Sequence, residues 1–191
     1  MLEVELWDLD PVVCGIWQYL IRASEAEILS LPDLDGDQSV QDLNVCQEAR
    51  HLIGFWLNKG TTHPAHVPGA WYRSKIRPLS SWGPQVRQRI ASQLGAIRHW
   101  KIRQGSYEDI PNPAATWFVD PPYVGKGYRY RCGSQRLNFP KLGEWCKSRS
   151  GLVVVCEQEG AEWLPFVELA SIKSARANRS MEMVWINGGE E

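Results

Sequence analysis

The residues with the clearest chemical potential lie in the stretch WFVDPPYVGKGYRY, residues 117–130. A short apolar run ends in Asp120, and Pro121, Pro122 and Tyr123 follow it directly. Proline restricts the backbone and donates no hydrogen bond, so the carbonyl groups of this segment stay available as acceptors. A carboxylate, a neighbouring carbonyl and an aromatic ring suit a planar base with an exocyclic amino group. The two acceptors can take its two N–H protons while the ring stacks on the base.

The apolar run before Asp120, residues 115–120, predicts a short strand. The alternating residues 2–9 predict another strand, which ends in the acids Asp8 and Asp10. In an open parallel sheet, ligands bind beyond the carboxyl ends of the strands. We therefore expect the acids that end these two strands to lie on the same rim of one sheet.

Apolar spacing predicts the remaining elements. We expect helices at residues 11–30, 41–58, 84–97 and 139–149. We expect further strands at residues 99–104, 151–157, 166–174 and 180–187. The last two strands flank ARANR and predict an antiparallel hairpin near the C-terminus. Strands that alternate with helices predict an α/β layer fold with a mostly parallel sheet.

The charges are segregated along the chain, although the formal net charge is only −1. No Asp or Glu lies between Glu48 and Glu108, an interval that holds ten Lys and Arg residues. A second acid-free stretch, residues 121–143, holds Lys126, Arg129, Arg131, Arg136 and Lys141. Interleaved aromatic residues and this segregation indicate a surface for a polyanion. The alternative is a solvated basic face whose charges pair with acids elsewhere in the fold.

The composition excludes several other classes of protein. The five cysteines form no C-x-x-C pair, and their odd number argues against a disulfide framework. We therefore expect reduced thiols. We also expect no metal site, because zinc requires three or four ligands and the sequence shows no such group of residues. No apolar run approaches the ~20 residues that span a bilayer, and no signal peptide is visible. We therefore expect a cytoplasmic protein with no membrane partner.

The DPPY motif after an apolar strand resembles the catalytic motif of the DNA N6-adenine methyltransferases, the Dam-like group that uses S-adenosyl-L-methionine. WDLDP and the helix after it are similar to the family's second strand, whose acidic residue holds the cofactor ribose. GSYEDIP resembles the segment that lines the cofactor adenine, and VVVCEQEGAEWLPF and MEMVWIN resemble the closing strands. LIGFWLNKG through WGPQVRQRIASQ resembles the inserted DNA-recognition region of phage-type members.

This resemblance implies a Rossmann-like S-adenosyl-L-methionine-dependent methyltransferase sheet with helices on both faces. We expect residues 1–38 and 99–191 to form the catalytic domain, and residues 39–98 to form an inserted, mostly helical DNA-recognition region. The implied partner is double-stranded DNA. The implied location is the cytoplasm of a bacterial host, and a phage or prophage source is compatible with the family.

The resemblance also implies a role for each site residue. Tyr123 stacks on an adenine that is flipped out of the duplex, and Asp120 and the Pro121 carbonyl accept from N6. Pro122 completes the catalytic motif. The residues expected to bind the cofactor are Asp8, Ser106, Tyr107 and Asp120. The residues expected to bind DNA are Lys59, Arg73, Lys75, Arg77, Lys126, Arg129 and Arg131.

The chain departs from the family pattern at its N-terminus. Family members begin with a G-S-K-like segment, a strand and an F-x-G-x-G-like turn that approaches the methionine part of the cofactor. Only Met1 precedes Leu2, so we expect this first central strand to be absent, leaving a gap between the strands at 2–9 and 99–104. An upstream segment, a separate polypeptide that supplies the glycine-rich loop, or decay of the chain would each explain the departure. Ser106 is a smaller departure, because many members carry an acid there.

Two alternative functions remain open. A catalytically inactive or truncated relative would act as a nucleic-acid-binding protein that keeps the basic region. A methyltransferase could also act on another planar amino group, such as cytosine N4 or a glutamine amide. Those families usually show Ser-Pro-Pro-Tyr or Asn-Pro-Pro-Tyr, whereas this chain has Asp120.

Overall fold

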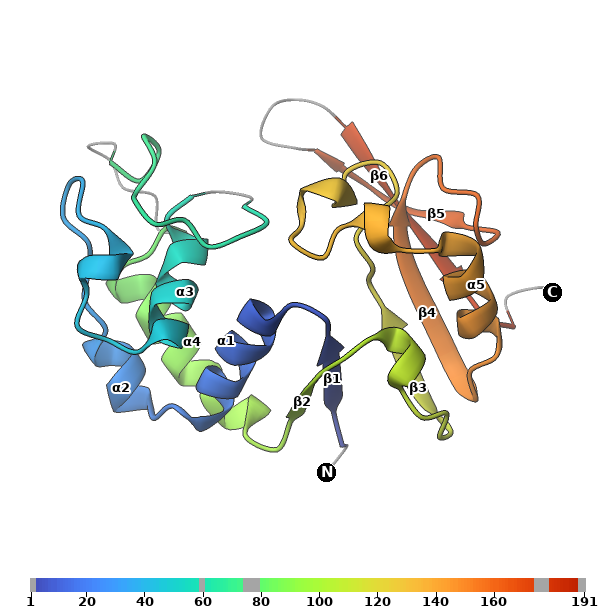
Figure 1. Cartoon of the computed structure of the whole chain (residues 1–191), viewed down its shortest axis with the longest axis horizontal. Coiled ribbons are helices and arrows are strands. Elements are labelled where there is room, and N and C mark those ends of the chain that lie inside the picture. The colour runs from blue at the N-terminus through green and yellow to red at the C-terminus, as the bar shows by residue number, and fades with distance from the viewer. Residues whose placement is uncertain (1–2, 59–60, 74–79, 174–178, 189–191) are drawn as a thin grey trace. The chain divides into compact units, whose positions relative to one another are not determined.

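The structure is a computed structural model that describes residues 3–58, 61–73, 80–173 and 179–188. The chain divides into two compact units, termed unit 1 (Met1–Tyr107) and unit 2 (Glu108–Glu191) (Figure 1). Both contain helices and strands, which confirms the expected α/β class. Within the described ranges, no helix is long and apolar enough to cross a bilayer.

The first helices of unit 1 begin at side-chain caps. α1 (Pro11–Arg22) starts where the Asp10 carboxylate accepts the Val12 N–H at 2.9 Å. The predicted continuous helix at 11–30 is wrong, because the chain leaves the helix at Ala23 and starts α2 (Glu25–Ser30). The Ser24 hydroxyl caps α2 by accepting the Glu27 N–H at 3.1 Å, so a second N-terminus replaces a helix interior.

The helix predicted at 41–58 also begins later than expected. The 3₁₀ turn η1 (Val40–Asp42) precedes it, and Ser39 and Asp42 cap each other's backbone there. α3 (Gln47–Trp56) follows. α4 (Pro84–Ile97) confirms the predicted helix at 84–97, and its first position is a proline that needs no intrahelical N–H partner.

The core of unit 1 centres on Trp82, which is fully buried and donates its indole N–H to the Pro32 carbonyl at 2.8 Å. Apolar side chains from α2, α3 and α4 surround it. Leu34 and Val40 belong to the same core, so the predicted boundary between residues 38 and 39 lies inside it. The division into a catalytic domain and an inserted DNA-recognition region stays a prediction.

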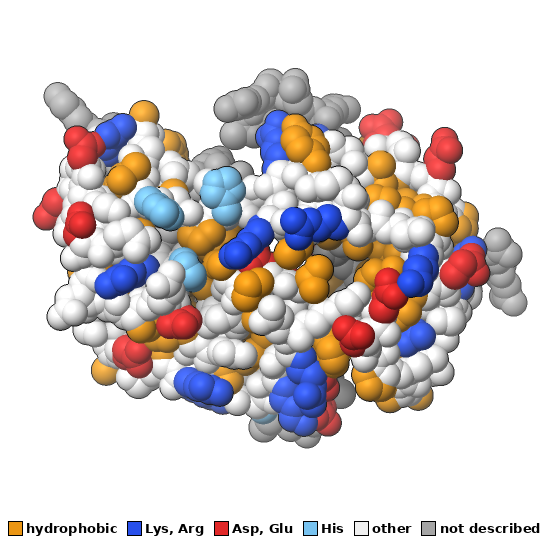
Figure 2. Space-filling model, viewed as in Figure 1, with side chains coloured by type: hydrophobic (Ala, Val, Ile, Leu, Met, Phe, Trp, Pro, Cys, Tyr) orange, Lys and Arg blue, Asp and Glu red, His pale blue; other side chains and the backbone are white. Residues whose placement is uncertain are grey.

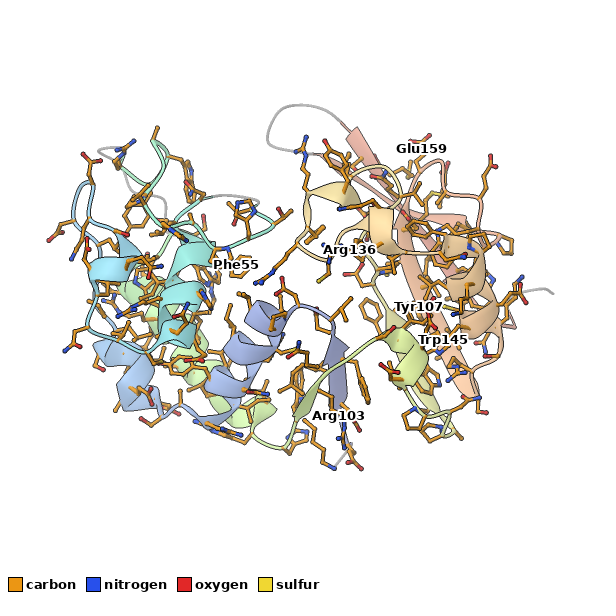
Figure 3. The ribbon with its side chains drawn as sticks, in the orientation of Figure 1. Phe55, Arg103, Tyr107, Arg136, Trp145 and Glu159 are labelled. Carbon is orange, nitrogen blue, oxygen red and sulfur yellow. The ribbon has the colours of Figure 1, made fainter. Side chains whose placement is uncertain are left out.

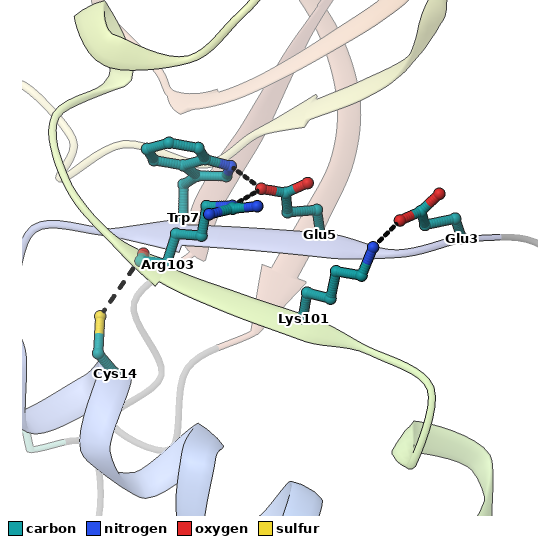
Figure 4. Close-up of polar contacts among 6 residues, drawn as sticks. All are labelled: Glu3, Glu5, Trp7, Cys14, Lys101 and Arg103. Atoms are coloured by element: carbon teal, nitrogen blue, oxygen red, sulfur yellow. Dashed lines mark hydrogen bonds and ion pairs between the residues drawn. The ribbon is translucent and has the colours of Figure 1, made fainter.

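A short parallel sheet completes unit 1. β1 (Glu5–Asp8) pairs with β2 (Lys101–Gln104), with Glu5 opposite Lys101 and Asp8 opposite Gln104. Ion pairs of Lys101 with Glu3 and of Arg103 with Glu5 cross between the strands (Figure 4). The predicted gap between these two strands is therefore wrong. In the part of the chain that the structure describes, β1 and β2 pair only with each other.

Unit 2 contains a four-stranded mixed sheet in the order β3-β4-β6-β5. Its strands are β3 (Ala115–Val119), β4 (Gly151–Gln158), β5 (Val167–Lys173) and β6 (Arg179–Ile186). β3 runs parallel to β4, whereas β6 is antiparallel to both β4 and β5. The antiparallel pairing of β5 with β6 confirms the predicted C-terminal hairpin. Most of its turn, residues 174–178, lies outside the described residues.

One face of this sheet packs against α5 (Phe139–Lys147). The Asn138 side chain caps α5, and Trp117 of β3 meets Trp145 of α5 edge-on, with ring centroids 5.7 Å apart. Strand side chains alternate between faces. Phe118 and Leu152 therefore lie on the opposite face, where they are 69% and 48% exposed.

Candidate active site

The DPPY segment lies beyond the carboxyl end of β3, which runs parallel to β4. Asp120 is exposed, whereas Pro121, Pro122 and Tyr123 are half-buried. A capping role for Asp120 is not seen, because the next helical turn, η3 (Gly127–Arg129), begins seven residues later. The structure thus places a solvent-accessible carboxylate and a partly covered ring at the end of a parallel strand.

Three polar side chains lie close together here: Asp120, Tyr123 and Glu182. The Tyr123 hydroxyl donates to Glu182 Oε2 at 3.3 Å, and it is close enough to Asp120 to affect the pKa of that carboxylate. Neighbouring atoms displace enough water to raise the pKa of Asp120, although the hydrogen bond from Tyr123 acts in the opposite direction. Burial and the charges of Asp120 and Glu182 raise the pKa of Tyr123, so its hydroxyl remains a proton donor.

A fourth group faces the same carboxylates. Burial, together with the charges of Asp120 and Glu182, raises the pKa of the Cys156 thiol. This thiol therefore stays neutral at physiological pH and is a poor nucleophile. Of the side chains around Tyr123, Asp120 is the one that combines a negative charge with exposure at the strand end.

The structure adds a residue that sequence reasoning missed. Glu157 of β4 is fully buried, and its carboxylate accepts the Val124 N–H at 2.7 Å and the Gln158 N–H at 2.5 Å. Glu157 therefore fixes the backbone of Val124, the residue that follows Tyr123. The signal was the alternation of buried positions along β4, because Val153 and Val155 place the next alternate residue on the buried face.

The loop after the motif carries exposed basic side chains. Its first turn closes where the Gly127 N–H donates to the Tyr123 carbonyl at 2.7 Å. Lys126, Arg129 and Arg131 are exposed, and Arg136 projects from η4 (Ser134–Arg136) of the same loop (Figure 3). Basic side chains are visible over this segment in Figure 2. The predicted basic group therefore does accompany the motif.

Three of the predicted cofactor residues lie together in unit 1. Asp8 ends β1 opposite Gln104, and the Gly105 N–H donates to the Asp8 carbonyl at 3.0 Å. Ser106 and Tyr107 follow at the end of β2. Burial raises the pKa of Asp8, while the N–H of Asp10, 2.7 Å from Asp8 Oδ1, opposes that shift.

The fit of these residues to S-adenosyl-L-methionine is partial. A half-buried carboxylate at the end of a parallel strand suits the hydroxyls of a ribose. Among the described residues, no glycine-rich turn follows a parallel strand at this site to receive the methionine part. Asp8 and Asp120 end strands of two different sheets, so their shared rim stays a prediction.

The described basic residues between Glu48 and Glu108 interact with partners inside unit 1. Arg73 forms an ion pair with Asp37, and the predicted DNA-binding residues Lys59, Lys75 and Arg77 lie outside the described residues. Every basic residue of this interval that the structure describes contacts an acid, a backbone carbonyl or an aromatic ring: Arg50, Arg73, Arg87, Arg89, Arg98, Lys101 and Arg103. These contacts fit the alternative of a basic face with internal partners.

A separate cavity of about 550 Å³ lies in unit 1 among α1, α2 and α3. Tyr19, Glu27, Asp42 and Cys46 are among the side chains that line it, and none of the predicted site residues does. Within the described ranges, no three His, Cys, Asp or Glu residues are grouped as metal ligands would be. The cavity therefore contributes nothing to the site around Asp120.

The fold and the site define a mixed α/β protein with a carboxylate-Pro-Pro-Tyr segment at a strand end. No protein-family model matches the sequence, and no curated protein is significantly similar to it. The function therefore has to be inferred from the exposed carboxylate of Asp120, the neighbouring carbonyl of Pro121 and the half-buried ring of Tyr123.

Proposed function

We propose that this chain is a site-specific DNA methyltransferase, which transfers a methyl group from S-adenosyl-L-methionine to N6 of a flipped adenine. One observation carries the proposal: Asp120 is an exposed carboxylate beyond a parallel strand, and the half-buried Tyr123 follows it three residues later with its hydroxyl bonded to Glu182. The DPPY sequence and this geometry support the same assignment of roles.

The chain's own groups orient the amino group and accept its protons. The ring of Tyr123 stacks on the flipped adenine. Asp120 accepts one N6–H and the Pro121 carbonyl accepts the other, which draws the nitrogen lone pair out of conjugation with the ring. S-adenosyl-L-methionine supplies an activated methyl group when it is bound. Asp120 would take the N6 proton as the new N–C bond forms and the bond between the methyl group and the cofactor sulfur breaks, and its raised pKa makes its carboxylate a better acceptor.

The strand order in unit 1 is β2-β1, and in unit 2 it is β3-β4-β6-β5. The parallel pair of unit 1 is compatible with a Rossmann-like sheet that includes one further parallel strand, which the family resemblance implies.

One further feature supports an added strand. Isolated two-stranded parallel sheets are unusual, and parallel sheets are normally covered on both faces. We propose that an upstream segment or a separate polypeptide supplies this strand, together with the glycine-rich loop that would hold the methionine part of the cofactor.

The proposed DNA contacts lie on the loop after the motif. Lys126, Arg129 and Arg131 follow Asp120 by 6 to 11 residues and are exposed. Basic side chains beside a flipped base can hold the flanking phosphates, and their contribution weakens as the salt concentration rises. The same loop favours the second candidate function, a catalytically inert nucleic-acid-binding protein.

Methyl transfer to duplex oligonucleotides tests the proposal directly. The assay compares the wild type with Asp120→Ala and with Glu162→Ala, an exposed acid of unit 2 outside the site. It is run on the 191-residue chain and on the chain extended by any in-frame sequence that precedes codon 1. Asp120→Ala should lower turnover about 100-fold or more while the Kd for DNA stays unchanged.

Calorimetry with S-adenosyl-L-methionine separates the two candidate functions. A methyltransferase binds the cofactor and marks adenine N6. A chain that binds DNA in a salt-sensitive manner, but gives no heat of binding with the cofactor and transfers no methyl group in either form, would be an inert nucleic-acid-binding protein and not an enzyme.

A further inference from the structure

A buried charge holds the segment that follows the DPPY motif. Glu157 is 0% exposed, although a carboxylate is costly to remove from water unless hydrogen bonds compensate it. Two backbone N–H groups do so, from Val124 at 2.7 Å and from Gln158 at 2.5 Å. Charge-assisted bonds of this kind are stronger than neutral ones. Glu157 is therefore a firm anchor at the end of β4.

The anchor acts on the residues proposed to hold the adenine. Val124 directly follows Tyr123, so the bond to Glu157 fixes the backbone at one end of the motif. At the other end β3 is held by its pairing with β4, and two prolines restrict the residues between. The Gly127 N–H holds the Tyr123 carbonyl at 2.7 Å. The backbone from Asp120 to Val124 is thus restrained at both ends.

A second carboxylate restrains the ring of Tyr123. Glu182 of β6 is paired with Gln158 of β4, whereas Glu157 is paired with Met183. Adjacent side chains on a strand point to opposite faces, so Glu157 and Glu182 act from opposite faces of the sheet. The Tyr123 hydroxyl donates to Glu182 Oε2 at 3.3 Å.

We propose that Glu157 and Glu182 are positioning residues for the adenine site. Glu157 fixes the backbone that presents the Pro121 carbonyl, and Glu182 fixes the plane of the ring that stacks on the base. This inference rests on the proposed function. Neither carboxylate contacts the amino group. Their loss should therefore lower kcat with little change in the Kd for DNA, because small displacements of catalytic groups slow the chemical step.

The loop itself provides a readout that needs no activity. Trypsin can cut after Lys126 and Arg129 in the loop, and after Lys147 at the end of α5, all of which are exposed. In Glu157→Gln the side chain keeps its size, but its single amide oxygen replaces two charged acceptors. We expect cleavage in the loop to become about tenfold faster relative to cleavage at Lys147, because charge-assisted bonds to the loop are weakened. The matched control is Glu159→Gln, an exposed acid two residues along (Figure 3).

An unchanged ratio of loop cleavage to Lys147 cleavage in Glu157→Gln would overturn the role of Glu157. Faster cleavage at all sites, with a lower Tm, would also overturn it, since that pattern means general destabilisation. For Glu182, Glu182→Ala should lower kcat about tenfold, and Glu182→Gln should restore most of it because the amide oxygen accepts the hydroxyl. Equal loss in both variants, or no loss in either, would refute its role. Glu168→Ala on β5 is the control.

These outcomes separate the inference from the proposed function. A wild type that transfers no methyl group, in either form of the chain, contradicts the proposed function and with it the positioning of an adenine by either residue. The cleavage ratio still decides whether Glu157 anchors the loop. Methyl transfer that is fast in wild type and unchanged in Glu157→Gln refutes the positioning role and leaves the function intact.

Discussion

Gly127 faces Pro122 so closely that a β-carbon at residue 127 would lie 2.4 Å from the Pro122 carbonyl carbon. In Gly127→Ala the loop must move away from the DPPY segment, because the obstructing atoms belong to the backbone and the rigid ring of Pro122. We expect a loss of roughly 1–3 kcal/mol in the free energy of unfolding, the usual cost of overpacking. Urea unfolding followed by circular dichroism measures it.

The matched control is Gly95→Ala within α4. No atom beyond the chain neighbours and the nearby backbone of α4 lies within 4 Å of a β-carbon built at residue 95, and alanine favours a helix interior over glycine by roughly 0.5–1 kcal/mol. The control should therefore be neutral or stabilising. A Gly127→Ala variant as stable as this control would show that the loop accommodates the added methyl group.

Asp120→Asn should make the protein slightly more stable at neutral pH while it removes methyl transfer. Burial raises the pKa of Asp120 in the folded state, so the charged form is disfavoured by folding. At pH values between the pKa of Asp120 in the unfolded state and its higher pKa in the folded state, the folded state binds more protons. The free energy of unfolding therefore falls as the pH rises through this interval, and it then levels off. Asparagine carries no charge and avoids this penalty.

Thermal melting as a function of pH checks the sign of this effect. Asp120→Asn should exceed the wild type in Tm at pH 7, and the difference should disappear below the ordinary pKa of an aspartic acid, where both side chains are neutral. A Tm advantage that persists at low pH, or a variant that is less stable at pH 7, would contradict the raised pKa.

Trp82→Phe should destabilise unit 1. Trp82 is fully buried and donates its indole N–H to the Pro32 carbonyl at 2.8 Å. Phenylalanine leaves that carbonyl without the indole donor and creates a small cavity, with an expected cost of about 2–4 kcal/mol. Trp100→Phe is the control, because Trp100 is only half-buried and phenylalanine can still pack against Trp17. Equal stability losses in the two variants would refute a specific role for the Trp82 hydrogen bond.

The cysteines should differ strongly in reactivity. Burial, with the charges of Asp8 and Asp10, raises the pKa of Cys14 to about 11, and burial raises the pKa of Cys146 to about 12. Cys46 is exposed. Because the thiolate is the nucleophile, iodoacetamide at pH 8 should alkylate Cys46 about 100-fold or more faster than either buried thiol. Peptide mapping over time measures the rates, and comparable rates for Cys14 and Cys46 would contradict this burial.

Several elements could be predicted because local chemistry determines them. Pro84 marks the start of α4, and an apolar run marks β4. The break between α1 and α2 was missed although Ser24 followed by Glu27 is a capping pattern, because the apolar spacing continues through it. Local pattern also could not show that β1 pairs directly with β2, since strand pairing depends on contacts between residues nearly a hundred positions apart.

The candidate site was predictable to a similar extent. The sequence around Asp120 indicated an exposed acid at a strand end, and the structure has one. The anchoring role of Glu157 depends on a bond to Val124, 33 residues earlier, which sequence spacing does not reveal. The internal partners of the basic residues were equally hidden, because Arg73 meets Asp37 and Arg87 meets Asp33 only in the folded chain.

The exposure of Phe118 has a consequence for the protein inside a cell. Phe118 and Leu152 present adjoining apolar side chains on one face, and within the described ranges β3 pairs with β4 alone. A strand with an unpaired edge is a template for pairing with other chains, and an exposed apolar face is a second surface for association. Until another strand pairs with that edge and another surface covers Phe118, the newly synthesised polypeptide should therefore be prone to self-association.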